Sequence, residues 1–295
     1  MTTAACIDRA DYNPGGYQCL IYLCSTSGDQ DAPAEGRWPD AHSRREPVTS
    51  MATAIEIDGL SARYGPVDAL KDITLKVHEG EILGLIGLNG AGKTTLLKAI
   101  LMLIVPVAGK VLLFGQPHDQ PGSRSRLAYL PEKFQPPSHL CGHDFVRLSL
   151  AFYRERVSRA VSCALAEELD LDPAALRRPI RGYAKGMAQK LGVLATLLTG
   201  RPLLILDEPM SGLDPKARIL LKRQLVAARA RGRTILMSSH ILADHDELCD
   251  RVAVIHQGRL GYVGSPAGLK ESQGAPTLEM AFLAAIERDR PAALS

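Results

Sequence analysis

An eight-residue motif, Gly87-Leu-Asn-Gly-Ala-Gly-Lys-Thr94, constrains what this chain can fold into more than any other feature of the sequence. It matches the pattern GxxxxGK[ST] and lies after an apolar run, Ile82–Ile86, and before a helical pattern, Lys93–Leu103. Glycines let the backbone wrap closely around a phosphate group, and the following helix adds its positive end. Lys93 can reach the β- and γ-phosphates of a nucleotide, and the Thr94 hydroxyl can ligate Mg²⁺. The motif therefore predicts an α/β protein with a nucleotide site; the alternative is a glycine-rich turn that binds nothing.

Two carboxylates follow a second apolar run. Leu203–Leu206 is typical of a buried strand, and Asp207 and Glu208 come directly after it. The carboxyl ends of strands are where α/β sheets bind ligands. There Asp207 would hold Mg²⁺, directly or through water, and Glu208 would polarise an attacking water as general base. Alone, the pair is usually explained by a strand-ending turn, but downstream of a phosphate loop it predicts a hydrolytic site.

Strand and helix patterns alternate along the chain after residue 51. Strands are expected at Ile73–Val77, Ile82–Ile86, Val111–Phe114, Leu127–Leu130, Leu203–Leu206, Thr234–Ser238, Val252–Ile255 and Arg259–Val263. Helices are expected at Lys93–Leu103, Lys216–Ala230 and Leu278–Arg288, with a mainly helical stretch at 141–198 where Val157, Val161, Leu165 and Leu169 would share one face. The alternation predicts one α/β domain over residues 51–295, with a helical subdomain at about 133–200.

Residues 1–50 differ from the rest of the chain. They are rich in Gly, Pro, Ser, Asp and Thr and have no sustained period, so disorder is expected. The segment that starts at Met51 alternates like a strand. One hypothesis is that Met51 is the true start and that residues 1–50 come from an over-long gene prediction. Deleting residues 1–50 would then leave folding and activity unchanged.

Composition argues against several kinds of partner. The net charge is only +3, no long Lys/Arg block is present and aromatic residues make up 5%, so no nucleic-acid partner is expected. The longest apolar stretch, Ala99–Ala108, is roughly half the length of a membrane-spanning helix. The chain is therefore not expected to cross a bilayer by itself. The six cysteines lack CxxC spacing, which favours reduced thiols in a cytoplasmic protein.

Four segments, taken together, carry a family resemblance: the phosphate loop, Tyr183-Ala-Lys-Gly-Met-Ala-Gln-Lys190, Leu206-Asp-Glu-Pro-Met-Ser-Gly-Leu-Asp214 and Ser238-Ser-His240. Their order and spacing resemble the ATP-binding subunit of an ABC transporter over about residues 54–288. The resemblance implies a P-loop NTPase core of the α/β class with an antiparallel β subdomain and a helical subdomain. The short C-terminal tail and Lys185–Met187 resemble the exporter-type branch, which includes multidrug- and antibiotic-export proteins.

The resemblance also implies a role for each matching residue. Tyr64 stands where the family usually has an aromatic that stacks on adenine, and its alternative is a surface tyrosine at a strand end. His240 would contact the γ-phosphate and join Glu208 and Lys93 in catalysis. Tyr183–Met187, the signature segment below, would cap the γ-phosphate held by the opposite subunit. The implied ATP-binding set is Tyr64, Gly87, Leu88, Asn89, Gly90, Ala91, Gly92, Lys93, Thr94, Thr95, Ala184, Gly186 and Met187, and the implied Mg²⁺ set is Thr94, Asp207 and Glu132.

Two departures from the family pattern qualify these roles. Ala184 replaces a serine whose hydroxyl binds phosphate, which removes a hydrogen bond worth on the order of 0.5–1.5 kcal/mol. Gly186 remains, so close backbone approach and the helix dipole stay available. Where many members place a glutamine that senses Mg²⁺ and water, this chain has Glu132, with Gln135 close behind. Either residue can serve, and the sequence does not choose.

A short stretch carries imidazole and thiolate groups on His139, Cys141 and His143. Such groups suit Zn²⁺, so a zinc site is one interpretation of this stretch. No fourth ligand is evident, and the plainer interpretation is a loop that leads into a helix at Asp144–Phe152. By the resemblance, this region would face the membrane partner.

The resemblance finally implies a function: ATP hydrolysis that energises transport, with an outward direction, through a separate integral-membrane permease. A second copy of the chain or a homologous subunit would complete the site, at the cytoplasmic face of the cell membrane. One alternative is a soluble ABC ATPase acting in DNA repair or on ribosomes. A P-loop kinase or GTPase would leave residues 183–190, 211–214 and 238–240 unexplained, and a module without turnover is favoured only by Ala184. The transported substrate depends on the permease.

Overall fold

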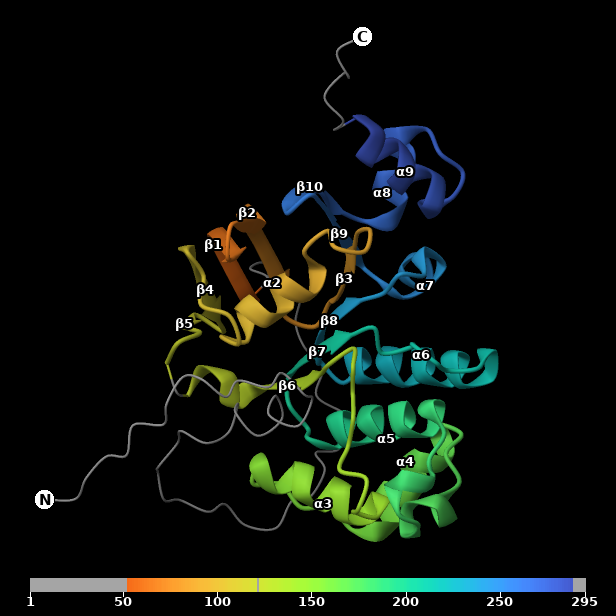
Figure 1. Ribbon diagram of the computed structural model, residues 1–295. Coiled ribbons are helices and arrows are strands. Elements are labelled where there is room, and N and C mark those ends of the chain that lie inside the picture. Colours follow the sequence, from red (N-terminus) through yellow and green to blue (C-terminus); the bar gives the residue numbers. More distant parts are fainter. Residues whose placement is uncertain (1–51, 121, 289–295) are drawn as a thin grey trace, which may run out of the picture.

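The computed structural model describes residues 52–120 and 122–288, so the expectations for residues 1–50 and for a start at Met51 lie outside the described residues. Two sheets organise the chain (Figure 1). The smaller one is antiparallel and contains β1 (Thr53–Tyr64), β2 (Val67–His78), β4 (Ala108–Leu113) and β5 (Gln116–Pro117), in the order β2-β1-β4-β5. It is the predicted antiparallel β subdomain.

The larger sheet has six strands in the order β10-β9-β3-β8-β7-β6. Their bounds are β3 Ile82–Ile86, β6 Leu127–Leu130, β7 Leu203–Asp207, β8 Thr234–Ser238, β9 Arg251–His256 and β10 Arg259–Gly264. Strands β9, β3, β8, β7 and β6 are parallel, and β10 pairs with β9 in the antiparallel direction. Parallel strands carry their carboxyl ends to one edge, so the residues after β3, β7 and β8 meet there.

The parallel strands are mainly apolar because both faces of the sheet are covered. Ile82 and Ile86 of β3 belong to the hydrophobic core with the helices of the helical subdomain. Leu83 and Leu85 of the same strand face a second core, made with the antiparallel sheet and α2 (Lys93–Ile100). Since successive side chains of a strand point to opposite faces, a continuous apolar run is what a two-sided burial requires.

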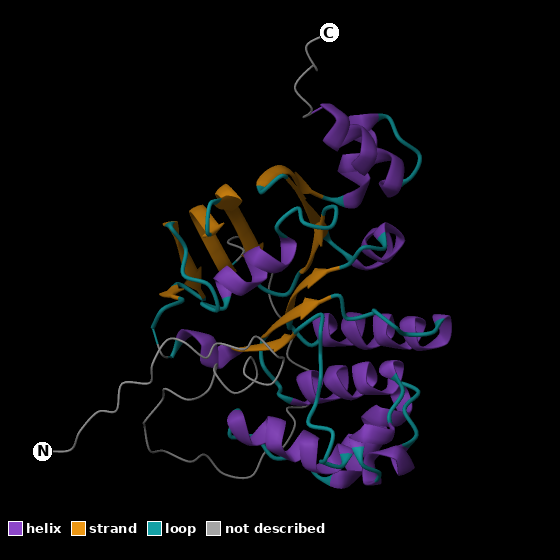
Figure 2. Ribbon diagram, in the orientation of Figure 1, coloured by secondary structure: helices purple, strands orange, loops and turns teal. Residues whose placement is uncertain are grey.

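Helix α2 lies between the two sheets, and most of the other helices lie on the opposite side of the larger sheet (Figure 2). After α2 these are α3 (Gly142–Phe152), α4 (Arg159–Glu168), α5 (Lys185–Leu198), α6 (Pro215–Ala230), α7 (Leu242–Leu248), α8 (Pro266–Gln273) and α9 (Leu278–Arg288), with 3₁₀ turns at Ser123–Arg126, Pro173–Arg177 and Ile180–Gly182. Helices α3, α4 and α5 lie together in Figure 1, on the side away from the antiparallel sheet. Their residues lie between 142 and 198, inside the stretch where a helical subdomain is predicted.

Two expected helices differ in detail from those observed. Helix α2 ends at Ile100 rather than Leu103, because Met102 has a left-handed backbone (φ 57°) that stops the helix. Helix α4 begins after Ser158, whose side chain accepts a hydrogen bond from the Val161 N–H, so Val157 lies outside the helix. The apolar face predicted from that spacing nevertheless packs on the core.

No helix in the described part of the chain is both long and apolar enough to cross a membrane.

Candidate nucleotide-binding site

The loop between β3 and α2 has the shape that its glycines require. Gly90 and Gly92 have left-handed backbones, with φ of 80° and 114°. A Cβ at Gly92 would lie 2.8 Å from the Ala69 carbonyl oxygen, and one at Gly87 would lie 2.5 Å from that of Ile255. Neither position can accept a side chain without moving main chain. The loop is thus a close backbone wrap that ends at the first turn of a helix, where N–H groups face outward.

Lys93 lies at the start of α2 and points back over the loop. Its ammonium donates hydrogen bonds to the carbonyl oxygens of Gly87, at 2.7 Å, and Leu88, at 3.3 Å. Burial lowers the pKa of Lys93, and the negative charges of Glu208 and Asp207 act in the opposite direction. The Lys93 ammonium beside the glycine loop suits the negative charge of a phosphate group. The two carboxylates that face it suit a divalent cation bound to the same ligand.

Asp207, the last residue of β7, is 1% exposed. The Ser238 hydroxyl, at the end of β8, donates to Asp207 Oδ1 over 2.6 Å. Burial raises the pKa of the Asp207 carboxyl, and hydrogen bonds from Ser238 and Thr94 oppose the rise. Within the described residues, the other oxygen, Oδ2, is buried without a hydrogen-bond partner. A buried carboxylate with one free oxygen, beside the Thr94 hydroxyl, is a set of hard oxygen donors that fits Mg²⁺.

Glu208 and His240 contact each other at the same edge of the sheet. The Nδ1 of His240 donates to Glu208 Oε2 over 2.7 Å, and the His240 main-chain N–H donates to the same oxygen over 3.2 Å. Glu208 has a left-handed backbone, with φ 52°, and its N–H donates to the Ser238 hydroxyl oxygen. Ser238 therefore holds both acidic residues, accepting from Glu208 and donating to Asp207. Strain of this kind in a non-glycine residue is typical of functional sites.

A cavity of about 510 Å³ unites these groups. It is lined by Ala69, Leu88, Asn89, Gly90, Gly92, Lys93, Thr94, Thr95, Glu132, Asp207, Glu208, Ser211 and His240. The structure thus brings the predicted catalytic and Mg²⁺ residues together, and Glu132 rather than Gln135 is the cavity-lining member of that pair. Ala69 and Ser211 were missed: Ala69 carries no chemical group that marks it, and Ser211 was noted only as part of the turn after Glu208.

Three groups of predicted residues lie outside that lining. Tyr64, at the end of β1, is 48% exposed and is not among the residues that line the cavity. Gly87 and Ala91 lie behind the loop against the Ile255 carbonyl and each other. The signature residues Ala184, Gly186 and Met187 belong to the start of α5, on the helical subdomain.

The signature segment is joined to the acidic strand end through the turn 211–214. A Cβ at Gly186 would lie 2.9 Å from the Gly212 carbonyl oxygen, so only glycine permits this approach. Gln189, one turn into α5, donates from Nε2 to the Pro209 carbonyl over 3.0 Å. Gln189 carries no local sequence signal for this role, because its partner lies 20 residues away along the chain. Ala184 is the N-cap of α5, with an extended backbone (φ −66°, ψ 159°) and, in the described structure, no side-chain cap.

Comparison with known proteins agrees with this geometry. Residues 70–211 match the family model described as ABC transporter. An uncharacterized ABC transporter ATP-binding protein of Nostoc sp. (strain PCC 7120) is 40% identical over 210 residues, which cover 70% of this chain and 63% of that protein. A Nod factor export ATP-binding protein I of Cupriavidus pinatubonensis is 34% identical over 238 residues, covering 78% of this chain and 71% of that protein. A solved ATP-binding subunit of an ABC transporter is similar at 32% identity, with a TM-score of 0.74 over 79% of this chain and 99% of that one.

The chain therefore belongs to the ABC transporter family, among its ATP-binding proteins. The predicted family and fold class are confirmed. The chain covers 63% and 58% of the length of two of the relatives it matches, so it spans less than two thirds of those proteins.

Proposed function

We propose that this chain binds ATP with Mg²⁺ in the cavity at the carboxyl ends of β3, β7 and β8, hydrolyses it, and drives export through a separate membrane permease. The observation that carries the proposal is the convergence of Lys93, Asp207, Glu208 and His240 on one cavity beside the phosphate loop. Groups from the ends of three parallel strands meet there, as expected for α/β ligand sites. Membership in the ABC transporter family supports the choice of ATP.

The residues divide the work by their chemistry. Loop N–H groups and Lys93 would bind the phosphates, and Thr94 and Asp207 Oδ2 would hold Mg²⁺. When bound, Mg²⁺ supplies positive charge against the phosphate oxygens. Glu208 would accept the proton of the attacking water as general base. His240, which now donates to Glu208, has a side chain 59% exposed and can turn toward the γ-phosphate. Tyr64, whose ring is exposed, would stack on adenine at the outer rim.

The site would be completed by a second copy or a homologous subunit. The start of α5 offers the positive end of a helix with no acidic residue in its described first turn, and it is outside the cavity of its own chain. A helix end of this kind favours an anion. ATP held by one chain would then be covered by Ala184, Gly186 and Met187 of the other, and hydrolysis would release the pair.

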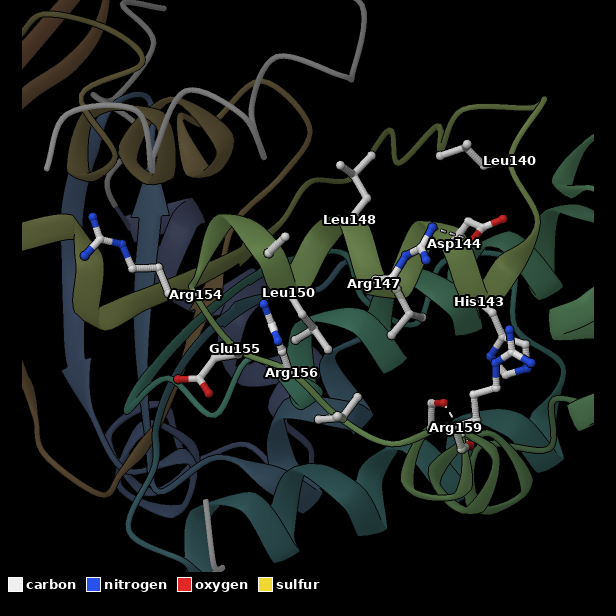
Figure 3. Close-up of a pocket in the computed structure, with 14 residues that line it drawn as sticks. Leu140, His143, Asp144, Arg147, Leu148, Leu150, Arg154, Glu155, Arg156 and Arg159 are labelled. Atoms are coloured by element: carbon white, nitrogen blue, oxygen red, sulfur yellow. Dashed lines mark hydrogen bonds and ion pairs between the residues drawn. The ribbon is translucent and has the colours of Figure 1, made fainter. Parts of the chain in front are cut away.

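The permease would dock on the helical subdomain. A second cavity, of about 1040 Å³, lies along α3 and α4 (Figure 3). Figure 3 shows Arg147 paired with Asp144 and the imidazole of His143 beside Arg159, while Arg154 and Arg156 lie at the other end. Leu148, 41% exposed, adds apolar surface. A groove with arginines and an apolar side chain suits a partner segment, and the membrane partner would hold this subunit at the cytoplasmic face of the cell membrane.

Export is proposed because a related protein is named for it. The Cupriavidus relative, 34% identical to this chain, is named as a Nod factor export protein. The compound moved by this chain depends on its permease. Co-purification of this chain with a multi-span membrane protein from its own cells tests the transport role, and a chain that associates instead with DNA or ribosomes would contradict it.

The hydrolytic role is tested by Glu208→Gln. Gln keeps the size of the side chain but cannot take the water proton, so turnover should fall by about 10²- to 10⁴-fold while ATP affinity is kept. The measurements are phosphate release and nucleotide titration, and an ATP-bound dimer should accumulate in size-exclusion chromatography. Near-normal turnover in this variant would rule out Glu208 as the base.

A further inference from the structure

A histidine that does not touch the cavity lies directly behind it. His245, on α7, is fully buried, and the mechanism proposed above does not use it. Its Nε2 lies 3.2 Å from the Ser239 carbonyl oxygen, and its Nδ1 lies 3.4 Å from the Cys249 sulfur. A buried imidazole with a partner on each nitrogen is held in one orientation.

The chemistry of the two partners fixes where the proton of this imidazole lies. A carbonyl oxygen only accepts, so Nε2 must carry the hydrogen and donate to Ser239. Nδ1 is then an acceptor, and the Cys249 thiol can donate to it. Burial lowers the pKa of His245 and raises that of Cys249, so the imidazole is neutral and the thiol keeps its proton. Both groups are therefore in the states that the two hydrogen bonds need.

The strand that leads into the phosphate loop forms the opposite wall. A Cβ at Gly84, in the middle of β3, would lie 2.2 Å from His245 Nδ1 and 2.8 Å from the Cys249 sulfur. The imidazole thus lies against the main chain of β3 without space to move. It joins the rigid centre of the sheet to the segment that carries His240.

The hydrogen bond from His245 ends on a peptide unit with a second role. The Ser239 carbonyl and the His240 N–H belong to one planar peptide group. That N–H donates to Glu208 Oε2 over 3.2 Å. Because the group is planar, holding its oxygen sets the direction of its hydrogen. A bond to the carbonyl also polarises the amide and strengthens the N–H as a donor.

We propose that His245 is a positioning residue for ATP hydrolysis, which orients the Ser239–His240 peptide so that its N–H fixes the Glu208 carboxylate. The inference rests on the proposed function, because it concerns the rate of the hydrolytic step. It assigns His245 no contact with nucleotide. Its loss should therefore reduce kcat and leave ATP affinity and KM nearly unchanged.

The test compares side chains of graded reach at position 245. His245→Gln places an amide Nε2 about where the imidazole Nε2 lies, so it can still donate to Ser239. His245→Asn has its donor nearer the backbone, and His245→Leu has none. Steady-state ATPase assays should show kcat lowered about 3- to 10-fold in the Asn and Leu variants, the effect of one hydrogen bond, and largely restored in the Gln variant. Nucleotide titration should give unchanged affinity for all three.

A matched control separates positioning from packing. His118 is also buried, and its Nδ1 lies 3.3 Å from the Ile100 carbonyl oxygen, beyond the far end of α2. His118→Leu should lower the midpoint of thermal unfolding but keep kcat. Equal kcat in the Gln and Leu variants at position 245, or a loss of ATP affinity that matches the loss of kcat, would overturn the positioning role.

Direct observation of the proton does not depend on any variant. In ¹⁵N-histidine NMR of the wild-type chain, His245 should be a neutral imidazole with its hydrogen on Nε2; the Nδ1–H tautomer would overturn the proposal. A failure of the proposed function is distinguishable from these results. It would appear as full turnover in Glu208→Gln, or no turnover in the wild type, whatever the state of His245.

Discussion

The two parts of the proposed ATP site differ in how completely one chain builds them. At the ends of β7 and β8, Asp207 is 1% exposed and Ser238 is fully buried. The Ser238 hydroxyl donates to Asp207 over 2.6 Å and accepts from the Glu208 N–H over 3.0 Å. At the start of α5, Ala184 and Lys185 are exposed. The first part is rigid before any ligand arrives. The second is a helix end whose N–H groups still need a partner.

The difference teaches that two properties of this fold are separable: the binding of nucleotide by one chain, and the completion of the site by the α5 helix end of a second chain. Buried, paired polar groups belong to the part that would hold nucleotide and Mg²⁺ in fixed geometry. The signature segment contacts its own chain where Gly186 lies against the Gly212 carbonyl. Ala184 and Lys185, at the start of the helix, remain exposed. Substitutions in the first part should therefore affect chemistry, and those in the second should affect association.

The largest effect is expected from Asp207→Asn. The loss of the carboxylate that would hold Mg²⁺ should reduce hydrolysis by about 100-fold or more. The same variant should raise the free energy of unfolding measured without Mg²⁺, because burial raises the pKa of Asp207 and so disfavours its charged form in the folded state. For a raised carboxyl pKa, stability is greatest below the unfolded pKa and is lost as pH rises through the folded pKa. Urea unfolding across pH should show this loss in the wild type and less of it in the variant.

Asp244 provides the matched control for that stability gain. It is buried like Asp207, but it accepts hydrogen bonds from Arg218, at 2.7 Å, and pairs with Lys222, at 3.0 Å. Asp244→Asn should therefore destabilise the fold, because it leaves two cations beside a neutral group. A loss of stability in both variants would contradict the idea that the buried Asp207 carboxylate lacks a compensating cation in the free chain.

An intermediate effect is expected from Gly186→Ala. The added methyl would meet the Gly212 carbonyl at 2.9 Å, and main chain must move to admit it. Overpacking of this kind costs about 1–3 kcal/mol of folding stability, and it displaces the start of α5 from the position described here. The displaced helix end should weaken the ATP-dependent association. Analytical ultracentrifugation should detect the weaker dimer, while ATP binding to the single chain is kept. Gly182→Ala, whose Cβ would meet open space, is the control; equal behaviour of the two variants would place the signature segment outside the interface.

The smallest effect is expected from Ala184→Ser. Ser158 and Ser265 already cap α4 and α8 by accepting from the N–H three residues on, at 3.3 Å and 3.0 Å. A serine at the same position of α5 should add about 0.5–2 kcal/mol to the free energy of unfolding and should preserve or raise ATPase activity. Thermal unfolding and phosphate release measure both. A large loss of activity would show that the start of α5 packs differently from this description.

Much of the site could be predicted because its residues follow strands that are apolar on both faces. The bounds of β3, β6 and β8 agree with the predicted runs. The phosphate loop follows β3, Asp207 is the last residue of β7, and His240 lies two residues after β8. Contacts that join distant segments had no local signal. The bond from Ser238 to Asp207 spans 31 residues, and the one from Gln189 to Pro209 spans 20.

Tyr64 illustrates a different limit. Its place at the end of β1 was predicted, but whether its ring reaches a base depends on how the antiparallel sheet sits beside the cavity, which no local pattern sets. The end of α2 was missed for a related reason. Ile100–Leu103 is apolar enough to continue a helix, and the turn there is set by the left-handed backbone of Met102. Apolar periodicity indicates which face of a helix is buried, but it does not indicate the residue at which the helix ends.

The turn after Glu208 gives the molecule a mechanical property. Ser211 lines the cavity, and the carbonyl of the next residue, Gly212, bears on Gly186. A single peptide bond separates what the cavity contacts from what the signature helix contacts. We therefore expect a displacement of Ser211 by a bound ligand to move the Gly212 carbonyl and, through it, the start of α5. The turn and the start of α5 can lie this close because Gly212 and Gly186 both lack a side chain.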